Sequence, residues 1–397
     1  MSDIFNNTEI AYLHKNNREL SRAFYLFKIL NNKTLVNVGS YLTNFAINTK
    51  LPVEKLIQWT VFDHFCGGIS EEECMPKVNR MFEKGLNSIL DYSVEGKNDE
   101  SSFNASLNKI LDLIDFVKTK REIPFVVFKP TALGRLDLYQ KKGLNENFTS
   151  KEAEEWEKII HRFESICEKS SSNKVKILID AEESWMQDAA DILVETMMQK
   201  YNKQNGLIYN TVQMYRSDRL DYIKKLTEKA KTSGFMVGLK LVRGAYMEKE
   251  NQRAIKNYYQ TPICKSKEAS DANFDAALDF VMSNIDHISI FAGTHNEKST
   301  YKLMKLMEMN GIQKSDERIW FCQLFGMSDN ISYRLSGDGY NVAKYIPYGP
   351  IKEVLPYLLR RAKENTSVAG QTNRELLLLN REQQRRKHLK SKCSTRM

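Results

Sequence analysis

The sequence predicts an α/β fold, a (β/α)8 TIM-like barrel with an N-terminal helical region, and three observations support it. Eight short runs rich in β-branched and aliphatic residues recur after residue 86. Most of these runs are continuously apolar, which is typical of parallel strands covered by helices. An amphipathic stretch follows each of them, and eight such units in a row match the barrel in number and size.

The elements follow from this pattern in chain order. The expected strands are Ser88–Val94, Pro124–Lys129, Val175–Ala181, Leu207–Tyr215, Met236–Arg243, Ile288–His295, Trp320–Phe325 and Val342–Tyr348. Helical spacing of apolar residues predicts helices over Glu19–Leu30, Val53–Phe65, Ser184–Tyr201, Arg219–Ser233 and Asp271–Asn284, with a polar helical insert at Lys151–Lys169. A doubly wound sheet would also alternate strands and helices, but the count of eight favours the barrel.

The same pattern divides the chain into three parts. We expect a helical region over residues 1–85, the barrel over residues 86–370, and a basic amphipathic tail over residues 371–397.

Composition limits the class of protein. Hydrophobic residues make up 42% of the 397 residues, which is enough to bury a core. The first twenty residues contain Asp3, Glu9 and Glu19 and no apolar leader, so we expect a cytoplasmic protein. The six cysteines form no CxxC pair and no zinc-site spacing is present, so we expect no metal. The net charge of +9 is spread along the chain without an aromatic stripe, which argues against nucleic acid binding.

Polar residues stand at the ends of the expected strands, where a barrel forms its mouth. They are Lys129, Asp180, Gln213, Arg243, His295 and Tyr348. Strand ends are also where any chain returns to water, so each residue alone is weak evidence. The sequence contains no GxGxxG or P-loop motif, so a bound dinucleotide would not lie on a Rossmann scaffold.

One helix carries a pair of guanidinium groups. Tyr357, Arg360, Arg361 and Glu364 have the spacing i, i+3, i+4 and i+7, which places them on one face. Two guanidinium groups on one face suit a carboxylate ligand, and Glu364 can orient Arg360. A solvated charged face is the alternative.

Three other segments combine a strand end with hydrogen-bonding groups. Asp180 directly ends an apolar run and can anchor a hydrogen-bond network, although the acids after it also suit a helix N-cap. Lys240 lies inside an apolar run, so it is either paired or extended to solvent. Arg243 precedes a glycine and suits a phosphate, and Thr294 with His295 suits a nucleotide contact.

These features together resemble the proline dehydrogenase family, including the barrel of the bifunctional proline utilisation flavoproteins. The resemblance covers about residues 55–380 and is nearer to the mitochondrial-type branch. The matching segments are Phe62–Gly68, Ile89–Gly96, Phe128–Gly134, Asn210–Tyr215, and Arg360–Arg361 with Tyr345.

The resemblance implies that FAD lies over the barrel mouth and that L-proline is the substrate. The implied catalytic residues are Asp180, Lys240 and Lys129. The implied substrate-binding residues are Lys129, Arg360, Arg361, Tyr345, Tyr357, Glu364, Leu241 and Tyr246. The implied cofactor-binding residues are Ala181, Gln213, Lys240, Arg243, Gly244, Ala245, Thr294 and His295. Many relatives have arginine in place of Lys240, and lysine lacks the planar fork of arginine.

The resemblance further implies oxidation of proline to Δ1-pyrroline-5-carboxylate, with electrons passed to a membrane quinone. A separate pyrroline-5-carboxylate dehydrogenase would take the product. The tail pairs an apolar run with the basic cluster Arg385–Lys390, which suits peripheral contact with the inner face of a membrane. A helix that packs on the barrel and ends in a basic tail is the alternative.

Two other activities remain open from the sequence. The same chemistry on hydroxyproline is the nearer one, although Tyr345 would crowd a ring hydroxyl. A cofactor-free lyase or aldolase that uses Lys129 or Lys240 as a Schiff base is the other.

Overall fold

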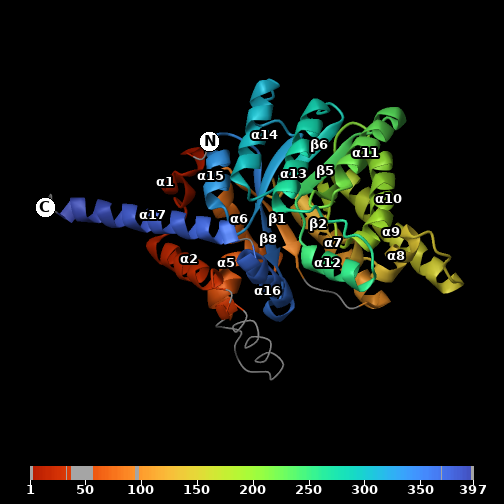
Figure 1. The fold of residues 1–397 in the computed structure, drawn as a ribbon, viewed down its shortest axis with the longest axis horizontal. Helices are drawn as coiled ribbons and strands as arrows, with labels where there is room; N and C mark the ends of the chain where they lie inside the picture. Colours follow the sequence, from red (N-terminus) through yellow and green to blue (C-terminus); the bar gives the residue numbers. More distant parts are fainter. Residues whose placement is uncertain (1–2, 33, 37–56, 94–97, 368, 395–397) are drawn as a thin grey trace. The chain divides into compact units, whose positions relative to one another are not determined.

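Eight strands form a closed barrel in the order β1 to β8, so the predicted fold class is confirmed (Figure 1). The computed structural model describes the chain except residues 1–2, 33, 37–56, 94–97, 368 and 395–397, and except the side chains of 360–371 and 392–394. The strands are β1 Asn87–Tyr92, β2 Phe125–Phe128, β3 Lys176–Ile179, β4 Ile208–Gln213, β5 Val237–Val242, β6 Ile288–Gly293, β7 Ile319–Leu324 and β8 Val342–Tyr348. The ladders from β2 through β7, and the ladder between β1 and β8, are parallel.

The chain divides into two compact units, Met1–Glu95 with Gln323–Met397, and Gly96–Cys322. We call the second the central unit and the first the terminal unit. The central unit contains helices α7 Glu100–Val117, α8 Leu136–Gly143, α9 Ser150–Asn173, α10 Ser184–Tyr201, α11 Arg219–Ser233, α12 Met247–Lys256, α13 Lys267–Ser283 and α14 Glu297–Met309. The terminal unit contains helices α1 Thr8–Ala11, α2 Asn17–Leu30, α5 Asp63–Phe65, α6 Glu71–Phe82, α15 Asp329–Gly337, α16 Ile351–Ser367 and α17 Ala369–Ser394, and a π-helical turn Gln58–Phe62.

Aromatic rings fill the interior of the central unit. Phe125 of β2 contacts Tyr209 of β4, Phe291 of β6 and Trp320 of β7, with ring centroids 5.1–5.6 Å apart. Side chains alternate between the two faces of a strand. The residues two and four positions further along, such as Lys129 beyond β2, therefore face the same interior.

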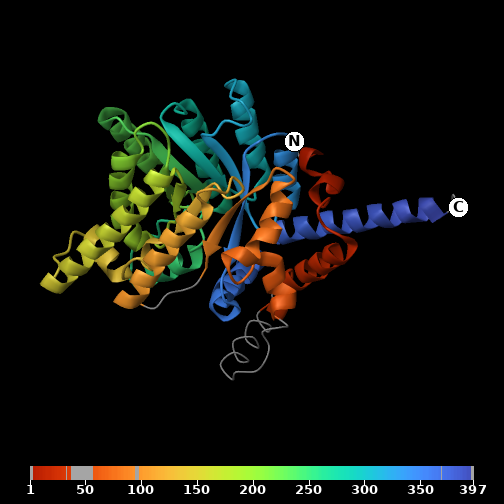
Figure 2. The ribbon, with the colours of Figure 1, turned by 180° about the vertical axis from the view of Figure 1, so that it is seen from behind.

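In the terminal unit, the N-terminal helices pack against the C-terminal ones, as the reverse view also shows (Figure 2). Leu20 and Phe27 of α2 share a buried apolar cluster with Tyr357 of α16 and Leu378 of α17. Arg386 of α17 donates to the carbonyl groups of Tyr12 and Lys15 and to the Asn17 side chain, at 2.9–3.0 Å. The basic end of α17 is thus partly engaged within its own unit.

Most expected elements coincide with observed ones, and α10 and α11 have the predicted bounds. The expected strands are one or two residues too long at several ends, and Val94 of the first one lies outside the described residues. The polar or apolar character of the sequence marks where residues are buried, whereas a strand ends where its neighbour stops pairing. Residues 53–56 of the expected helix Val53–Phe65 lie outside the described residues. The three-part division of the chain stays a prediction.

Candidate active site

Asp180 joins two lysines at the end of the central unit's strands. Lys240 Nζ donates to Asp180 Oδ1 at 2.5 Å, and Lys129 Nζ lies 3.4 Å from Asp180 Oδ2. The Lys240 side chain is 8% exposed and that of Lys129 is 30% exposed. A buried ammonium group needs a counter-charge. Asp180 therefore compensates Lys240, and the Lys129 ammonium group remains within reach of a ligand.

Strand geometry brings these three residues together. Lys129 directly follows β2, Asp180 directly follows β3, and Lys240 lies within β5. The Asp180 N–H donates to the Phe128 carbonyl at 2.9 Å, so the parallel ladder continues one residue beyond the strands. The carboxyl ends of barrel strands form the mouth where such enzymes act. Of the two alternatives for Lys240, a paired lysine and a lysine extended to solvent, the structure shows the paired one.

Two buried side-chain oxygen atoms lie on β4, the strand that pairs with β5. Gln213 Oε1 and Thr211 Oγ1 on β4 have no hydrogen-bond partner among the described residues. Thr211 pairs in register with Lys240, and Gln213 lies two residues nearer the strand's end on the same face. An unsatisfied buried acceptor costs about 1–3 kcal/mol. Gln213 thus fits a ligand that presents an N–H group, and the pyrimidine edge of a flavin has one.

Arg243 follows β5 and is held by the protein itself. Its Nε donates to Asp271 Oδ1 at 2.6 Å, and its two terminal nitrogens donate to Thr294 Oγ1 at 2.8 Å and Ser299 Oγ at 2.9 Å. Burial raises the pKa of Asp271, but its bonds to Lys267 and Arg243 outweigh this and lower the pKa. Arg243 therefore contributes a fixed positive charge, with Thr294 oriented beside it.

Sequence reasoning missed the role of Glu182, which it treated only as a helix-cap candidate. Its carboxylate accepts from Thr131 Oγ1 at 2.6 Å and from the Thr131 N–H at 3.0 Å. Burial raises the pKa of Glu182 to about 7 despite these bonds. The turn Pro130–Ala132 begins directly after Lys129, so Glu182 fixes the backbone beside that lysine. The acidic run after Asp180 was the available signal.

The other predicted residues of the central unit lie on the same loops. Ala181 follows Asp180 and is buried, and His295 follows Thr294. Leu241 is fully buried, and alternation places it on the opposite face of β5 from Lys240. Gly244 has a φ of +131°, and a Cβ there would lie 2.4 Å from the Tyr215 ring, so the turn that leads to Ala245 and Tyr246 requires glycine.

The remaining predicted residues belong to the terminal unit. Tyr345 lies on β8 and is 7% exposed. Tyr357 lies on α16 within the buried apolar cluster of that unit. Arg360, Arg361 and Glu364 follow on α16, and their side chains lie outside the described residues. Their proposed grip on a carboxylate stays a prediction.

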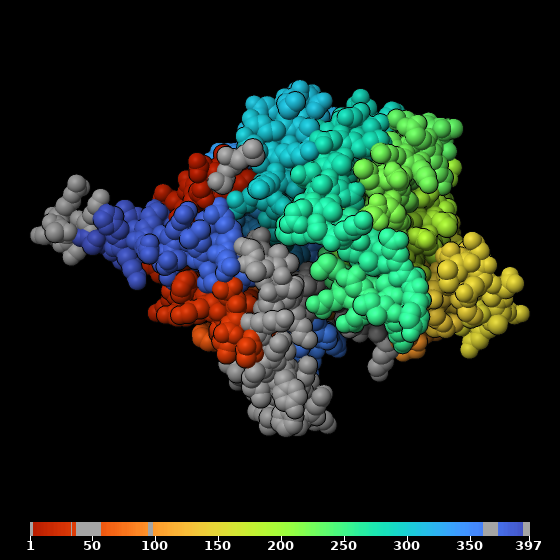
Figure 3. Space-filling model, in the orientation of Figure 1, coloured from red at the N-terminus to blue at the C-terminus, as the bar shows by residue number. Residues whose placement is uncertain are grey.

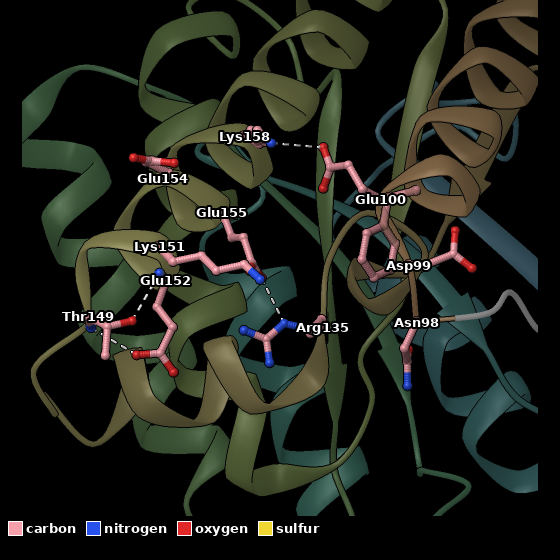
Figure 4. Close-up of a pocket in the computed structure, with 11 residues that line it drawn as sticks. Asn98, Asp99, Glu100, Arg135, Thr149, Lys151, Glu152, Glu154, Glu155 and Lys158 are labelled. Carbon is pink, nitrogen blue, oxygen red and sulfur yellow. Dashed lines mark hydrogen bonds and ion pairs between the residues drawn. The ribbon is translucent and has the colours of Figure 1, made fainter.

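A separate hollow of about 550 Å³ opens at the surface of the central unit (Figure 4). Charged residues line it, and Arg135 there is paired with Glu155 at 2.7 Å. None of the predicted site residues belongs to its lining. Lys158 in the lining also pairs with Glu100 at 3.5 Å.

The fold defines a protein of the (β/α)8 class, and the charged cluster at the strand ends is its candidate active site. A profile described as "Proline dehydrogenase" matches residues 74–374. The chain belongs to the proline dehydrogenase family, and is thus an oxidoreductase of proline metabolism.

Individual relatives agree with this membership. The chain is 34% identical over 323 residues to the carbapenem antibiotics biosynthesis protein CarD of Pectobacterium carotovorum subsp. carotovorum, across 81% of this chain and 83% of that protein. It is 38% identical over 243 residues to the mitochondrial proline dehydrogenase 1 of Homo sapiens, across 60% of this chain and 40% of that protein.

A solved structure supports the fold. The crystal structure of proline utilization A from Bdellovibrio bacteriovorus, a protein inactivated there by N-propargylglycine, aligns with a TM-score of 0.71 at 21% identity. The alignment covers 93% of this chain and 40% of that one. The chain thus spans less than half the length of two of these three proteins. Within the described part of the chain, every helix is too short or too polar to cross a membrane.

Proposed function

We propose that this chain oxidises L-proline to Δ1-pyrroline-5-carboxylate with FAD as its cofactor. The observation that carries the proposal is the Asp180 cluster with Lys129 and Lys240 at the strand ends. Its position is that of a barrel active site, and its partly exposed ammonium group suits a carboxylate substrate. Membership of the family supplies the substrate class.

Substrate binding is a task for the cations of the chain. Lys129 would hold the proline carboxylate together with Arg360 and Arg361, and Glu364 would orient the arginine pair. Tyr345, with Tyr357 and Tyr246, would wall the ring; Leu241, on the opposite face of β5 from Lys240, is left out of this wall. The proline amine must be neutral for reaction, because its lone pair forms the new C=N bond. A fixed orientation of the proline ring reduces the entropic part of the activation free energy.

The cofactor would be held by the loops around Gln213. The residues proposed for this are Ala181, Gln213, Lys240, Arg243, Gly244, Ala245, Thr294 and His295. A bound flavin supplies the two-electron acceptor that the protein itself lacks. Positive charge from Lys240 and Arg243 favours negative charge that develops on a neighbouring group. Gln213 Oε1 would gain the partner it lacks.

An absorbance spectrum of purified protein tests the proposal. The protein should show flavin absorbance, and addition of L-proline should bleach it. A colourless protein that borohydride couples to its substrate would instead favour a Schiff-base lyase. The ion pair between Lys240 and Asp180 argues against that reaction, because an ammonium group has no lone pair for attack.

Hydroxyproline oxidation is the nearest alternative reaction. Tyr345 is buried on β8, and a phenol there would crowd a ring hydroxyl. Comparison of kcat/KM for proline and hydroxyproline separates the two activities.

We also propose that the reaction is the first step of proline catabolism, with a separate pyrroline-5-carboxylate dehydrogenase downstream. The similarity to a carbapenem biosynthesis protein favours a biosynthetic use of the same oxidation as a second candidate.

A membrane quinone is the proposed electron acceptor, with the end of α17 in peripheral contact with the bilayer. Arg385 and Arg386 already bond Glu382, so the exposed residues Lys387 and Lys390 are the proposed contact. Sedimentation with anionic vesicles should decrease with added salt, since the attraction is electrostatic. Vesicle binding that salt does not change would contradict this contact.

A further inference from the structure

Helix α12 has little apolar surface to hold it on the central unit. It begins directly after Tyr246, which the proposed function places against the substrate. Within α12 only Glu250 and Ala254 are buried, whereas Ile255 is 77% exposed and Met247 is 50% exposed. Figure 3 shows the green-teal residues of this segment at the surface. Burial of apolar area therefore cannot be the main force that fixes the helix.

A polar clamp joins α12 to the start of α10. Glu250 is fully buried, and its two carboxylate oxygens accept from the Ser184 N–H and from Ser184 Oγ, each at 2.6 Å. The N-cap residue of α10, Glu183, makes no capping bond of its own, so Glu250 supplies the cap from another helix. Lys249 pairs with Glu183 at 2.9 Å beside it.

The clamp is also bonded to Tyr246, the residue directly before α12. The Glu250 N–H donates to the Tyr246 carbonyl at 2.9 Å, so the two residues share the first turn of the helix. The other side of Tyr246 is fixed by the glycine turn at Gly244, which packs on the Tyr215 ring. Tyr246 thus stands between two fixed points, one of which is Glu250.

The same clamp reaches the charged cluster. Ser184 lies four residues after Asp180 and begins α10, where the loop that leaves β3 ends. One end of this loop bonds the lysines of the site, and the other end bonds α12. The position of Tyr246 is therefore tied to the position of Asp180 through a single short segment.

We propose that Glu250 is a positioning residue, which docks α12 on Ser184 and so holds Tyr246 against the proline ring. This inference rests on the proposed function. A wall for the ring acts in the bound ground state and in the transition state alike, so its displacement weakens binding more than it slows the chemical step.

The test compares Glu250→Ala with wild type as flavin-loaded enzyme. We expect proline KM to rise about tenfold through loss of charge-assisted bonds, with kcat within about twofold. Hydrogen exchange should increase at the amides of residues 247–256 and not at β5. Glu250→Gln, which retains an acceptor for the Ser184 N–H, should restore most of the affinity. Gln252→Ala on the exposed face of the same helix is the matched control and should change neither quantity.

Two results would overturn the inference. One is unchanged exchange in α12 of Glu250→Ala, and the other is faster exchange with unchanged KM. A double variant with Ser184→Ala should add nothing to Glu250→Ala, because both remove the same contact. The two hypotheses fail in different ways. If proline does not bleach the flavin of the wild type, the proposed function is wrong. If the wild type reacts and Glu250→Ala reacts with the same KM, only the role of Glu250 is wrong.

Discussion

Each unit of the molecule contains an aspartate that meets two lysines. In the central unit, Asp180 meets Lys129 and Lys240. In the terminal unit, Asp329 at the start of α15 meets Lys344 of β8 at 2.9 Å and Lys15 at 2.8 Å. The chemistry of the two clusters is therefore the same, and only their surroundings differ.

Solvent access separates the two clusters. The Asp329 and Lys344 side chains are 7% and 1% exposed, and His14 also approaches Asp329 at 3.3 Å. The Asp180 cluster instead includes Lys129, which is 30% exposed. A closed cluster can only hold elements together, whereas an open one can exchange a partner for a ligand. In this chain, the greater solvent exposure of Lys129 is therefore what makes the Asp180 cluster, rather than the Asp329 cluster, the candidate site.

The largest effect is expected from Asp329→Asn. The change leaves Lys344 buried without its counter-charge, which typically costs about 3–5 kcal/mol. Urea titration should show this loss in the free energy of unfolding, while activity per folded molecule stays at the wild-type level. Asp115→Asn, at an exposed carboxylate that pairs with Lys118 and Lys169, is the control and should unfold nearly like wild type. Equal free energies of unfolding of the two variants would mean that the Asp329 cluster does not stabilise the fold.

Asp180→Asn should show the reverse balance. Loss of the carboxylate frees both lysines to move, and a displacement of about 1 Å within a catalytic site can cost about 100-fold in rate. We expect kcat/KM for proline to fall by about that factor. The loss of stability should be smaller than for Asp329→Asn, because Lys240 and Lys129 are 8% and 30% exposed, against 1% for Lys344. A variant of Asp180 that loses stability but retains activity would erase the distinction between the clusters.

How much of this was predictable depends on the range of the interactions. The strands, and the gathering of Lys129, Asp180 and Lys240 at one end of them, follow from local pattern, because strand ends in a barrel meet whatever the loops do. That Asp180 is the partner of Lys240 did not follow from it. The Asp329 cluster was not predictable, since His14 and Lys15 reach it from a connector more than 300 residues away in sequence. The clamp at Glu250 was missed for the same reason, because no spacing relates it to Ser184.

Arg361→Ala tests the proposed role of the arginine pair on α16. Loss of one charge-assisted bond to the proline carboxylate should raise KM by at least about tenfold, with the flavin still bound. Steady-state kinetics together with the flavin spectrum measure both quantities. An unchanged KM would show that the carboxylate is held by the central unit alone, through Lys129.

The smallest effect concerns pH and the terminal cluster. Burial, together with nearby Asp329, raises the pKa of Glu375 to about 7 from a usual value of 4.5. Between these values the folded state keeps a proton that the unfolded state releases, so the free energy of unfolding falls as pH rises through this window. Each pH unit corresponds to about 1.4 kcal/mol for one such group, so a fall of about 1 kcal/mol between pH 5 and 6 is expected from Glu375.

Urea titrations at several pH values test this. Glu375→Gln, which retains the acceptor for the Ser328 N–H, should reduce the dependence of the free energy of unfolding on pH. Glu83→Gln, at an exposed position, should not. The same slope in both variants would assign the pH dependence elsewhere, with buried Glu182 of the central unit as the next group to replace.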